Sequence, residues 1–251
     1  IIEWGMVFTS RGLDRKYIDE LVKSGENLVI HFGGVGYDYE HSELGGVQLF
    51  FILNGVKLMV DYGQRPDHFN RFWSFPRSPR KYDILTISEL MDLYASIPGI
   101  FRMDYEWHRG NYCDHPVLGK YIPENLLDAM IFTHSHYDHV GGVSLVRPDM
   151  PIYTHPLATL MLKFWQYSSG RSINQFVDLI DQFSPIPNLE GKTKFMNGEE
   201  AVIPRDYRPV ENGVPFYIKN LKITPYLVDH SVPGAIGWII ETNSGNIAIS
   251  G

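Results

Sequence analysis

The chain contains almost no cysteine and no long hydrophobic run, and each absence excludes a class of protein. Cys113 is the only cysteine among the 251 residues, which excludes an intrachain disulfide and a zinc site built from cysteines. No stretch approaches the ~20 apolar residues that a membrane-spanning helix needs. The sequence also has no secretory signal pattern at its start. Together these absences predict a cytoplasmic protein with no membrane partner.

Positive charge is also scarce. Lysine and arginine total 22 against 29 aspartate and glutamate, so the formal net charge is -7 at pH 7. A polyanion such as RNA would then need a local basic patch, or bound metal ions, to be attracted to the chain. The balance argues against general nucleic-acid binding, but it does not exclude a nuclease that depends on metal.

Four side chains that can bind metal lie within six positions, in the segment His134-Ser135-His136-Tyr137-Asp138-His139. The apolar residues just before this segment predict a strand that delivers it, and Gly141-Gly142 follows it. In extended chain, residues two apart point to the same side, so His134 and His136 can reach one ion. Asp138 and His139 lie past a turn and can reach a second ion. This pattern predicts a dinuclear site that activates water for hydrolysis. The ligand types favour zinc, with manganese as the alternative.

The order of the predicted elements indicates an α/β (α+β) protein with two sheets face to face and helices outside. Strands are expected at 28–32, 47–53, 56–62, 126–132, 151–154, 216–225, 236–242 and 247–250, and helices at 14–23, 87–94, 156–166 and 173–183. Asn54-Gly55 predicts a tight hairpin turn, and Gly33 to Gly36 predicts a further turn. At this length we expect one domain, 1–251, with a Pro-, Arg- and aromatic-rich insertion at about 64–124.

A family resemblance now becomes visible. The pattern His134-x-His136-x-Asp138-His139 resembles the signature of the metallo-β-lactamase superfamily, and Asp61 in Val60-Asp61-Tyr62-Gly63 resembles the first motif of that family. The resemblance implies a four-layer αββα sandwich. It also implies that Asp61 supports the metal loop, that His230 joins His134 and His136 at the first ion, and that Asp138 orients the attacking water as the catalytic residue.

The residues around His230 narrow the resemblance. The pattern His230-Ser231-x-Pro233-x-Ala235-x-Gly237 is similar to the ribonuclease J and β-CASP nuclease branch. That similarity implies a phosphodiesterase that acts on RNA or single-stranded nucleic acid with two zinc ions. In that branch a carboxylate that bridges the metals follows a strand like the one before Gly251. We therefore expect a chain that is incomplete at its C-terminus, with the bridging aspartate beyond Gly251.

Several alternatives stay open at this point. The first is a small-molecule hydrolase of the same superfamily, acting on an ester, thioester, lactone or cyclic phosphodiester. The second is a non-catalytic binding subunit. His155 is expected to be a helix-entry residue with local hydrogen bonds, with a pocket-lining role as the alternative. The aromatic and arginine residues of 65–80 are expected to form a packed cover, with base stacking as the alternative. Substrate identity, exo- or endo-cleavage, metal occupancy and oligomeric state are left undecided.

Overall fold

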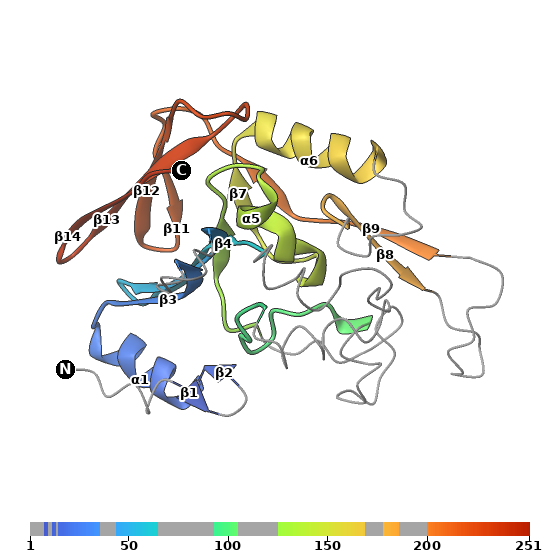
Figure 1. Cartoon of the computed structure of the whole chain (residues 1–251). Helices are drawn as coiled ribbons and strands as arrows, with labels where there is room; N and C mark the ends of the chain where they lie inside the picture. Colours follow the sequence, from blue (N-terminus) through green and yellow to red (C-terminus); the bar gives the residue numbers. More distant parts are fainter. Residues whose placement is uncertain are drawn as a thin grey trace, which may run out of the picture.

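The computed structural model describes residues 8–9, 12–13, 15–35, 44–64, 93–104, 125–168, 178–185 and 200–251. Within these residues a six-stranded sheet and a four-stranded sheet pack against each other, and helices cover the outer face of the larger sheet (Figure 1). The predicted fold class, a mixed α/β protein with two sheets face to face and helices outside, is confirmed. None of the described helices has the length and hydrophobicity needed to cross a bilayer.

The larger sheet has the strand order β10-β7-β6-β5-β4-β3. Its strands are β3 (Leu28–Val35), β4 (Leu44–Leu53), β5 (Val56–Tyr62), β6 (Ala129–Ile131), β7 (Ile152–Thr154) and β10 (Tyr207–Pro209). β3, β4 and β5 are antiparallel, whereas β5, β6, β7 and β10 are parallel. The predicted hairpin turn is confirmed, because Asn54 and Gly55 have φ values of 50° and 79° and join β4 to β5 as a turn with positive φ at both positions does.

The parallel pairing places the ends of three strands at one edge of the sheet. Asp61 lies near the end of β5, the histidine-rich segment follows β6, and His155 follows β7. Because parallel strands run in the same direction, their carboxyl ends meet at that edge, which is where α/β folds place their ligands. The candidate site is therefore positioned by strand order before any side chain is considered.

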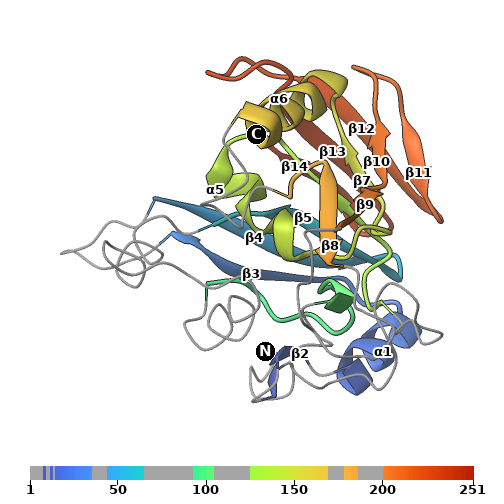
Figure 2. The same cartoon turned by 90° about the vertical axis from the view of Figure 1, so that its right-hand side faces the viewer.

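The smaller sheet is antiparallel throughout, in the order β11-β12-β13-β14. Its strands are β11 (Phe216–Ile218), β12 (Leu221–Leu227), β13 (Ile236–Thr242) and β14 (Gly245–Ile249). Its inner face packs on the larger sheet through a buried apolar cluster that contains Leu58, Val60, Ile131, Ile223 and Trp238. Figure 2 shows the smaller sheet crossing above the larger one, next to α6. This burial holds the loop between β12 and β13 against the carboxyl edge of β6.

A second apolar cluster lies on the other face of the larger sheet. The helices near this cluster are α1 (Arg15–Ser24), the one-turn α5 (Tyr137–Val140), the 3-10 helix η2 (Gly141–Leu145) and α6 (Pro156–Ser168). α1 contributes Ile18 and Leu21, and α6 contributes Leu162. The described part of the predicted insertion also packs here, through residues 93–101. Arg102 is fully buried and forms ion pairs with Asp104 at 2.8 Å and Asp178 at 2.7 Å.

Some predicted elements differ from the structure. Asp181–Pro185 forms strand β8, antiparallel to β9 (Glu200–Pro204), so the end of the helix predicted at 173–183 is wrong, and residues 173–177 lie outside the described residues. The backbone nitrogens of Ile180 and Asp181 donate instead to the side chain of Gln166 on α6. The turn predicted at Gly33 to Gly36 is wrong for residues 33–35, because these belong to β3, which continues to Val35 through two register shifts.

The predicted insertion is described only in part. Residues 93 and 94, the end of the helix predicted at 87–94, are not helical, and 87–92 lie outside the described residues. The segment 65–80 also lies outside them, so a packed cover and a base-stacking surface both stay predictions. The same holds for a single domain over 1–251.

Candidate metal centre

The histidine-rich segment begins where β6 ends and turns at once into α5. Phe132 still follows the strand direction, because its backbone N–H donates to the carbonyl oxygen of Tyr153 on β7 at 3.0 Å. His136 is the N-cap of α5, and the backbone nitrogens of His139 and Val140 donate to its carbonyl oxygen at 2.9 and 3.1 Å. The segment is therefore extended through His134 and His136 and turns before Asp138. This is the local geometry expected from the sequence.

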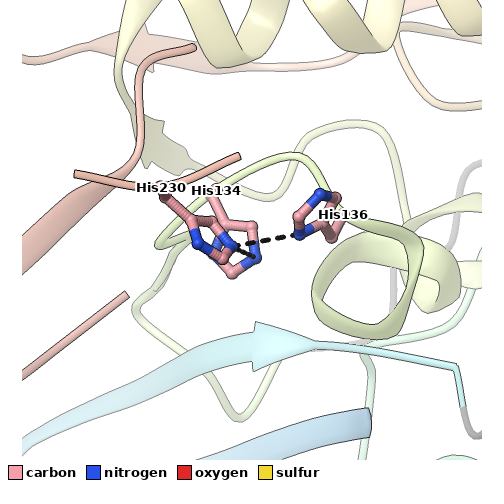
Figure 3. Close-up of side chains that lie close together, drawn as sticks. All are labelled: His134, His136 and His230. Atoms are coloured by element: carbon pink, nitrogen blue, oxygen red, sulfur yellow. Dashed lines mark hydrogen bonds between the residues drawn. The ribbon is translucent and has the colours of Figure 1, made fainter. Parts of the chain in front are cut away.

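Three imidazoles converge at this edge of the sheet. The Nε2 atom of His230 lies 3.2 Å from Nε2 of His134 and 3.1 Å from Nδ1 of His136. Figure 3 shows the three rings pointing toward one another, with His134 and His136 on one loop and His230 on another. His134 is buried, His136 is half-buried and His230 is exposed. The group is therefore accessible from one side.

The three nitrogens lie within 4.8 Å of one another, and the two pairs that include His230 have the spacing that a tetrahedral cation requires. Nitrogens about 2.0–2.1 Å from a tetrahedral Zn²⁺ lie roughly 3.3 Å from one another. The two separations of 3.1 and 3.2 Å come within a few tenths of an ångström of that spacing. A structural zinc site has four protein ligands, whereas a site with three leaves one position for water or substrate. The chemistry and spacing of the donors therefore fit a metal ion with an open position.

Asp61 supports this group through hydrogen bonds to Thr133 and His139, behind the converging nitrogens. Its two carboxylate oxygens accept hydrogen bonds from the backbone N–H and the hydroxyl of Thr133, both at 2.8 Å. One of them also lies 2.7 Å from Nδ1 of His139. Because Thr133 gives its only hydroxyl proton to Asp61, its oxygen must accept from Nδ1 of His134, 2.9 Å away. The Nε2 atom of His134 is thus left with a free lone pair, directed at the other two histidines.

A close backbone contact fixes the distance between Asp61 and the histidine-rich segment, residues 134–139. Gly63 lies against the carbonyl of Asp138, and a Cβ atom built on Gly63 would come within 1.6 Å of that oxygen. The same short loop is held from β4, where the buried amide of Gln48 donates to the carbonyl oxygen of Gly63 at 2.9 Å. Only glycine allows this approach, which brings Asp61 within hydrogen-bond distance of both Thr133 and His139.

The loop that carries His230 is held at both ends. The backbone N–H of Val228 donates to the carbonyl oxygen of Ala235 at 3.0 Å, which closes the loop. The N–H of Ile236 donates to the carbonyl oxygen of Thr133 at 2.9 Å, which ties it to the histidine-rich segment. Gly234, with φ of 79°, packs against the start of α6, and a Cβ atom there would lie 2.9 Å from the backbone nitrogen of Ala158. These contacts determine where His230 can lie.

Burial and mutual repulsion keep His134 and His136 neutral. Burial, followed by the charges of His139, His230 and His136, lowers the pKa of His134 to about 3. Burial also lowers the pKa of His136 below its usual 6.5. Burial acts in the same direction on His139, but the hydrogen bond and charge of Asp61 outweigh it and raise the pKa of His139. His134 and His136 therefore have lone pairs for a metal at neutral pH without losing a proton first.

The structure brings the six predicted site residues together to different degrees. His134, His136 and His230 form one convergent group, and Asp61 lies behind it. Asp138 and His139 lie beside this group, with Oδ2 of Asp138 3.8 Å from Nε2 of His139. Because Nδ1 of His139 faces Asp61, its Nε2 is the ring nitrogen left open to a further ligand.

Sequence reasoning missed three supporting roles in the site. Thr133 connects Asp61 to His134, Gln48 holds the loop after β5, and Ser231 lies with its hydroxyl oxygen 3.3 Å from Nε2 of His136. Thr133 and Ser231 each adjoin a predicted ligand, which is the one signal in the sequence that could have revealed them. His155 is confirmed as a helix-entry residue, because its Nδ1 accepts the N–H of Leu157 at 3.2 Å.

About half of the chain is similar in sequence to known proteins. The chain is 30% identical to ribonuclease J of Mycoplasma genitalium over 132 residues, which are 51% of this chain and 18% of that protein. It is 25% identical to ribonuclease J 1 of Streptococcus pyogenes over 142 residues, 52% of this chain and 19% of that one. The chain is similar in sequence to ribonuclease J. The aligned region thus makes up about a fifth of the length of these ribonucleases. No family model matches the chain.

One solved structure agrees with the fold, at a TM-score above 0.5. A protein of unknown function from Enterococcus faecalis V583 aligns with 90% of this chain and 43% of its own length, at 15% identity and a TM-score of 0.55. A metallo-β-lactamase fold protein from Bacillus subtilis aligns with 89% of the chain and 61% of its own length, at 14% identity and a TM-score of 0.42. At such identities the likeness concerns the fold alone. The chemistry has to be argued from the residues of the site.

Proposed function

We propose that the chain is a metal-dependent hydrolase that cleaves phosphodiesters in RNA or single-stranded nucleic acid. The observation that carries the proposal is the convergence of three imidazole nitrogens, from His134, His136 and His230, at separations of 3.1 and 3.2 Å. The similarity to two ribonucleases J supports the substrate class. The fold, with the ligands at the carboxyl ends of parallel strands, supports hydrolysis at an open edge.

The donor set favours zinc. Imidazole nitrogens suit zinc and its first-row neighbours, whereas manganese prefers more carboxylate and water oxygens. His134, His136 and His230 would hold one ion, and Asp138 with His139 would hold part of the shell of a second. When bound, such ions act as Lewis acids and lower the pKa of water toward neutrality. The second position has fewer ligands among the described residues, so we expect one ion to bind more tightly than the other.

The residues of the chain supply orientation and proton transfer. Asp138 is the half-exposed carboxylate beside the group, so it can accept a proton from the attacking water at an oxygen and orient that water toward the substrate phosphorus. Asp61 is 1% exposed, and its carboxylate accepts hydrogen bonds from Thr133 and His139, so it acts by positioning and not by proton transfer. His134 is fixed through Thr133 with its proton on Nδ1.

Charge favours metal ions over a basic surface as the means of binding a polyanion. The chain carries a net charge of -7, and such a balance repels RNA at long range. Two divalent cations would add four positive charges at the site itself, where the phosphodiester has to be cleaved. We therefore expect both the binding and the cleavage of RNA to depend on metal.

The test uses the full-length protein loaded with Zn²⁺ or Mn²⁺, with end-labelled RNA, labelled single-stranded DNA and bis(p-nitrophenyl) phosphate as substrates. We expect cleavage of RNA that chelation abolishes, and loss of both activity and bound metal in the double variant His134→Ala with His136→Ala. The matched control is His31→Ala, because His31 is an exposed histidine on β3 outside the group. The nuclease proposal is overturned if metal-loaded protein leaves RNA and single-stranded DNA intact. Cleavage of the small phosphodiester alone would favour a small-molecule hydrolase.

A further inference from the structure

The histidines of the site differ in which ring nitrogen faces the group. His134 and His230 present Nε2, whereas His136 presents Nδ1. A neutral imidazole has one proton and one lone pair, so His136 can bind a metal through Nδ1 only in the tautomer with its proton on Nε2. A hydrogen-bond acceptor at Nε2 of His136 would favour that tautomer, as Thr133 and Asp61 do at the rear nitrogens of His134 and His139.

Ser231 lies where that acceptor is needed. Its hydroxyl oxygen is 3.3 Å from Nε2 of His136, and it is the residue next to His230. We propose that Ser231 is a positioning residue for the metal centre: its hydroxyl accepts the Nε2 proton of His136 and so keeps Nδ1 free for the ion. This inference rests on the proposed metal site and deepens it. It assigns Ser231 a role in selecting the tautomer of a ligand.

The same hydrogen bond connects two parts of the site. Ser231 and His136 are 95 positions apart, on the β12–β13 loop and the loop after β6. At their bases these loops are joined by a backbone hydrogen bond: the N–H of Ile236, at the start of β13, donates to the carbonyl oxygen of Thr133, just after β6. The Ser231 contact adds a link at the exposed side, next to the ligand atoms. It therefore limits rotation of the His136 ring. Because Ser231 is the chain neighbour of His230, it also limits movement of His230.

The position of Ser231 separates this role from a structural one. Ser231 is exposed and lies on a loop outside the two apolar clusters. Removing its hydroxyl leaves no buried cavity and no buried polar atom without a partner, so the free energy of unfolding of the metal-free protein should not change. Groups that orient metal-ligating histidines change metal affinity by about 10–100-fold when removed. We expect that loss for Ser231→Ala.

The experiment compares the parent chain with Ser231→Ala, Ser231→Thr and Ser168→Ala. Ser168→Ala is the control, because it removes an exposed serine hydroxyl at the end of α6. Zn²⁺ affinity is measured by competition with a chromophoric chelator, and the visible spectrum of the Co²⁺-loaded protein reports the geometry around the ion. We expect weaker binding by about 10–100-fold and an altered Co²⁺ spectrum for Ser231→Ala, with parental values for Ser231→Thr and Ser168→Ala.

The tautomer is read directly by long-range ¹H–¹⁵N correlation spectra of the metal-free protein. We expect the proton of His136 on Nε2 in the parent and in Ser231→Thr, and a mixture of tautomers in Ser231→Ala. If the parent binds no Zn²⁺, the metal site itself is overturned. If the parent binds Zn²⁺ and Ser231→Ala binds it equally well, with the same Co²⁺ spectrum and tautomer, the role of Ser231 is overturned and the metal site stands.

Discussion

Asp61 and His139 are joined by a hydrogen bond of 2.7 Å between a carboxylate oxygen and Nδ1. Asp61 is 1% exposed and has a φ of 54°, a left-handed conformation that aspartate tolerates better than most residues. The same carboxylate accepts two bonds from Thr133. One buried side chain thus fixes the rings of two histidines that we propose as ligands of different ions, His139 directly and His134 through Thr133.

Replacing Asp61 should therefore weaken both the fold and the metal centre. Asp61→Ala removes the acceptor of three hydrogen bonds and leaves a buried N–H without a partner, which should cost about 3 kcal/mol in the free energy of unfolding. Asp61→Asn retains one carbonyl acceptor and should lose less. Urea denaturation of the metal-free protein measures the change. The control is Asp206→Ala, which breaks an exposed ion pair with Arg208 and should cost no more than about 1 kcal/mol. Equal stabilities of Asp61→Ala and this control would contradict the prediction.

The strands and the closeness of His134 to His136 could be predicted because their signals are local in the sequence. Alternation of apolar residues and the Asn54-Gly55 turn determine β4 and β5, and the histidine spacing follows from extended chain before a turn. The strand β8 could not be predicted this way, because Phe183 and its neighbours suit a helix or a strand equally. The choice depends on pairing with β9 and on the side chain of Gln166, which accepts two backbone bonds there.

The contacts behind the ligands were also beyond the sequence, since they join segments far apart in the chain. In the sequence Gly63 has the features of an ordinary turn residue. Only the structure shows that the carbonyl of Asp138 packs against it. Ser231 and His136 are 95 positions apart, and only the packing of the two sheets brings them together. The sequence thus predicts candidate metal ligands, whereas the residues that orient them depend on tertiary packing.

Gly63 should be the least replaceable glycine of the site. In Gly63→Ala the new Cβ atom would overlap the carbonyl oxygen of Asp138, and neither backbone segment can move without breaking the bonds of Asp61. We expect a loss of about 4 kcal/mol or more, seen as poor soluble yield or a much lower urea midpoint. Gly213→Ala is the matched control: φ there is 71° and no atom lies within 4 Å, so only about 1–2 kcal/mol of backbone strain is expected. A Gly63→Ala variant as stable as this control would refute the close approach.

Acid should weaken the start of α6 through His155. Its Nδ1 atom accepts the N–H of Leu157, which requires neutral imidazole, and burial lowers the pKa of His155 below its usual 6.5. Because the unfolded chain binds the proton more readily, this contribution is present above pH 6.5 and is lost as the pH falls through the lowered pKa. His155→Asn keeps a capping oxygen that does not titrate. Stability measured against pH should therefore fall less steeply below pH 6.5 in His155→Asn than in the parent. Identical slopes would show that His155 does not contribute in this way.

Metal should stabilise the folded chain, because the three nitrogens converge only when the β12–β13 loop and the loop after β6 are folded together. For a single site, Zn²⁺ at 100 times its dissociation constant should raise the free energy of unfolding by about 2.7 kcal/mol. The rise should disappear on chelation and in the double variant His134→Ala with His136→Ala, and it should persist in His31→Ala. Thermal unfolding with and without Zn²⁺ measures it. Because burial and the neighbouring histidines already keep the pKa of His134 at about 3, the effect should depend little on that residue's protonation between pH 6 and 8. Stabilisation of equal size in the double variant would place the bound metal elsewhere on the chain.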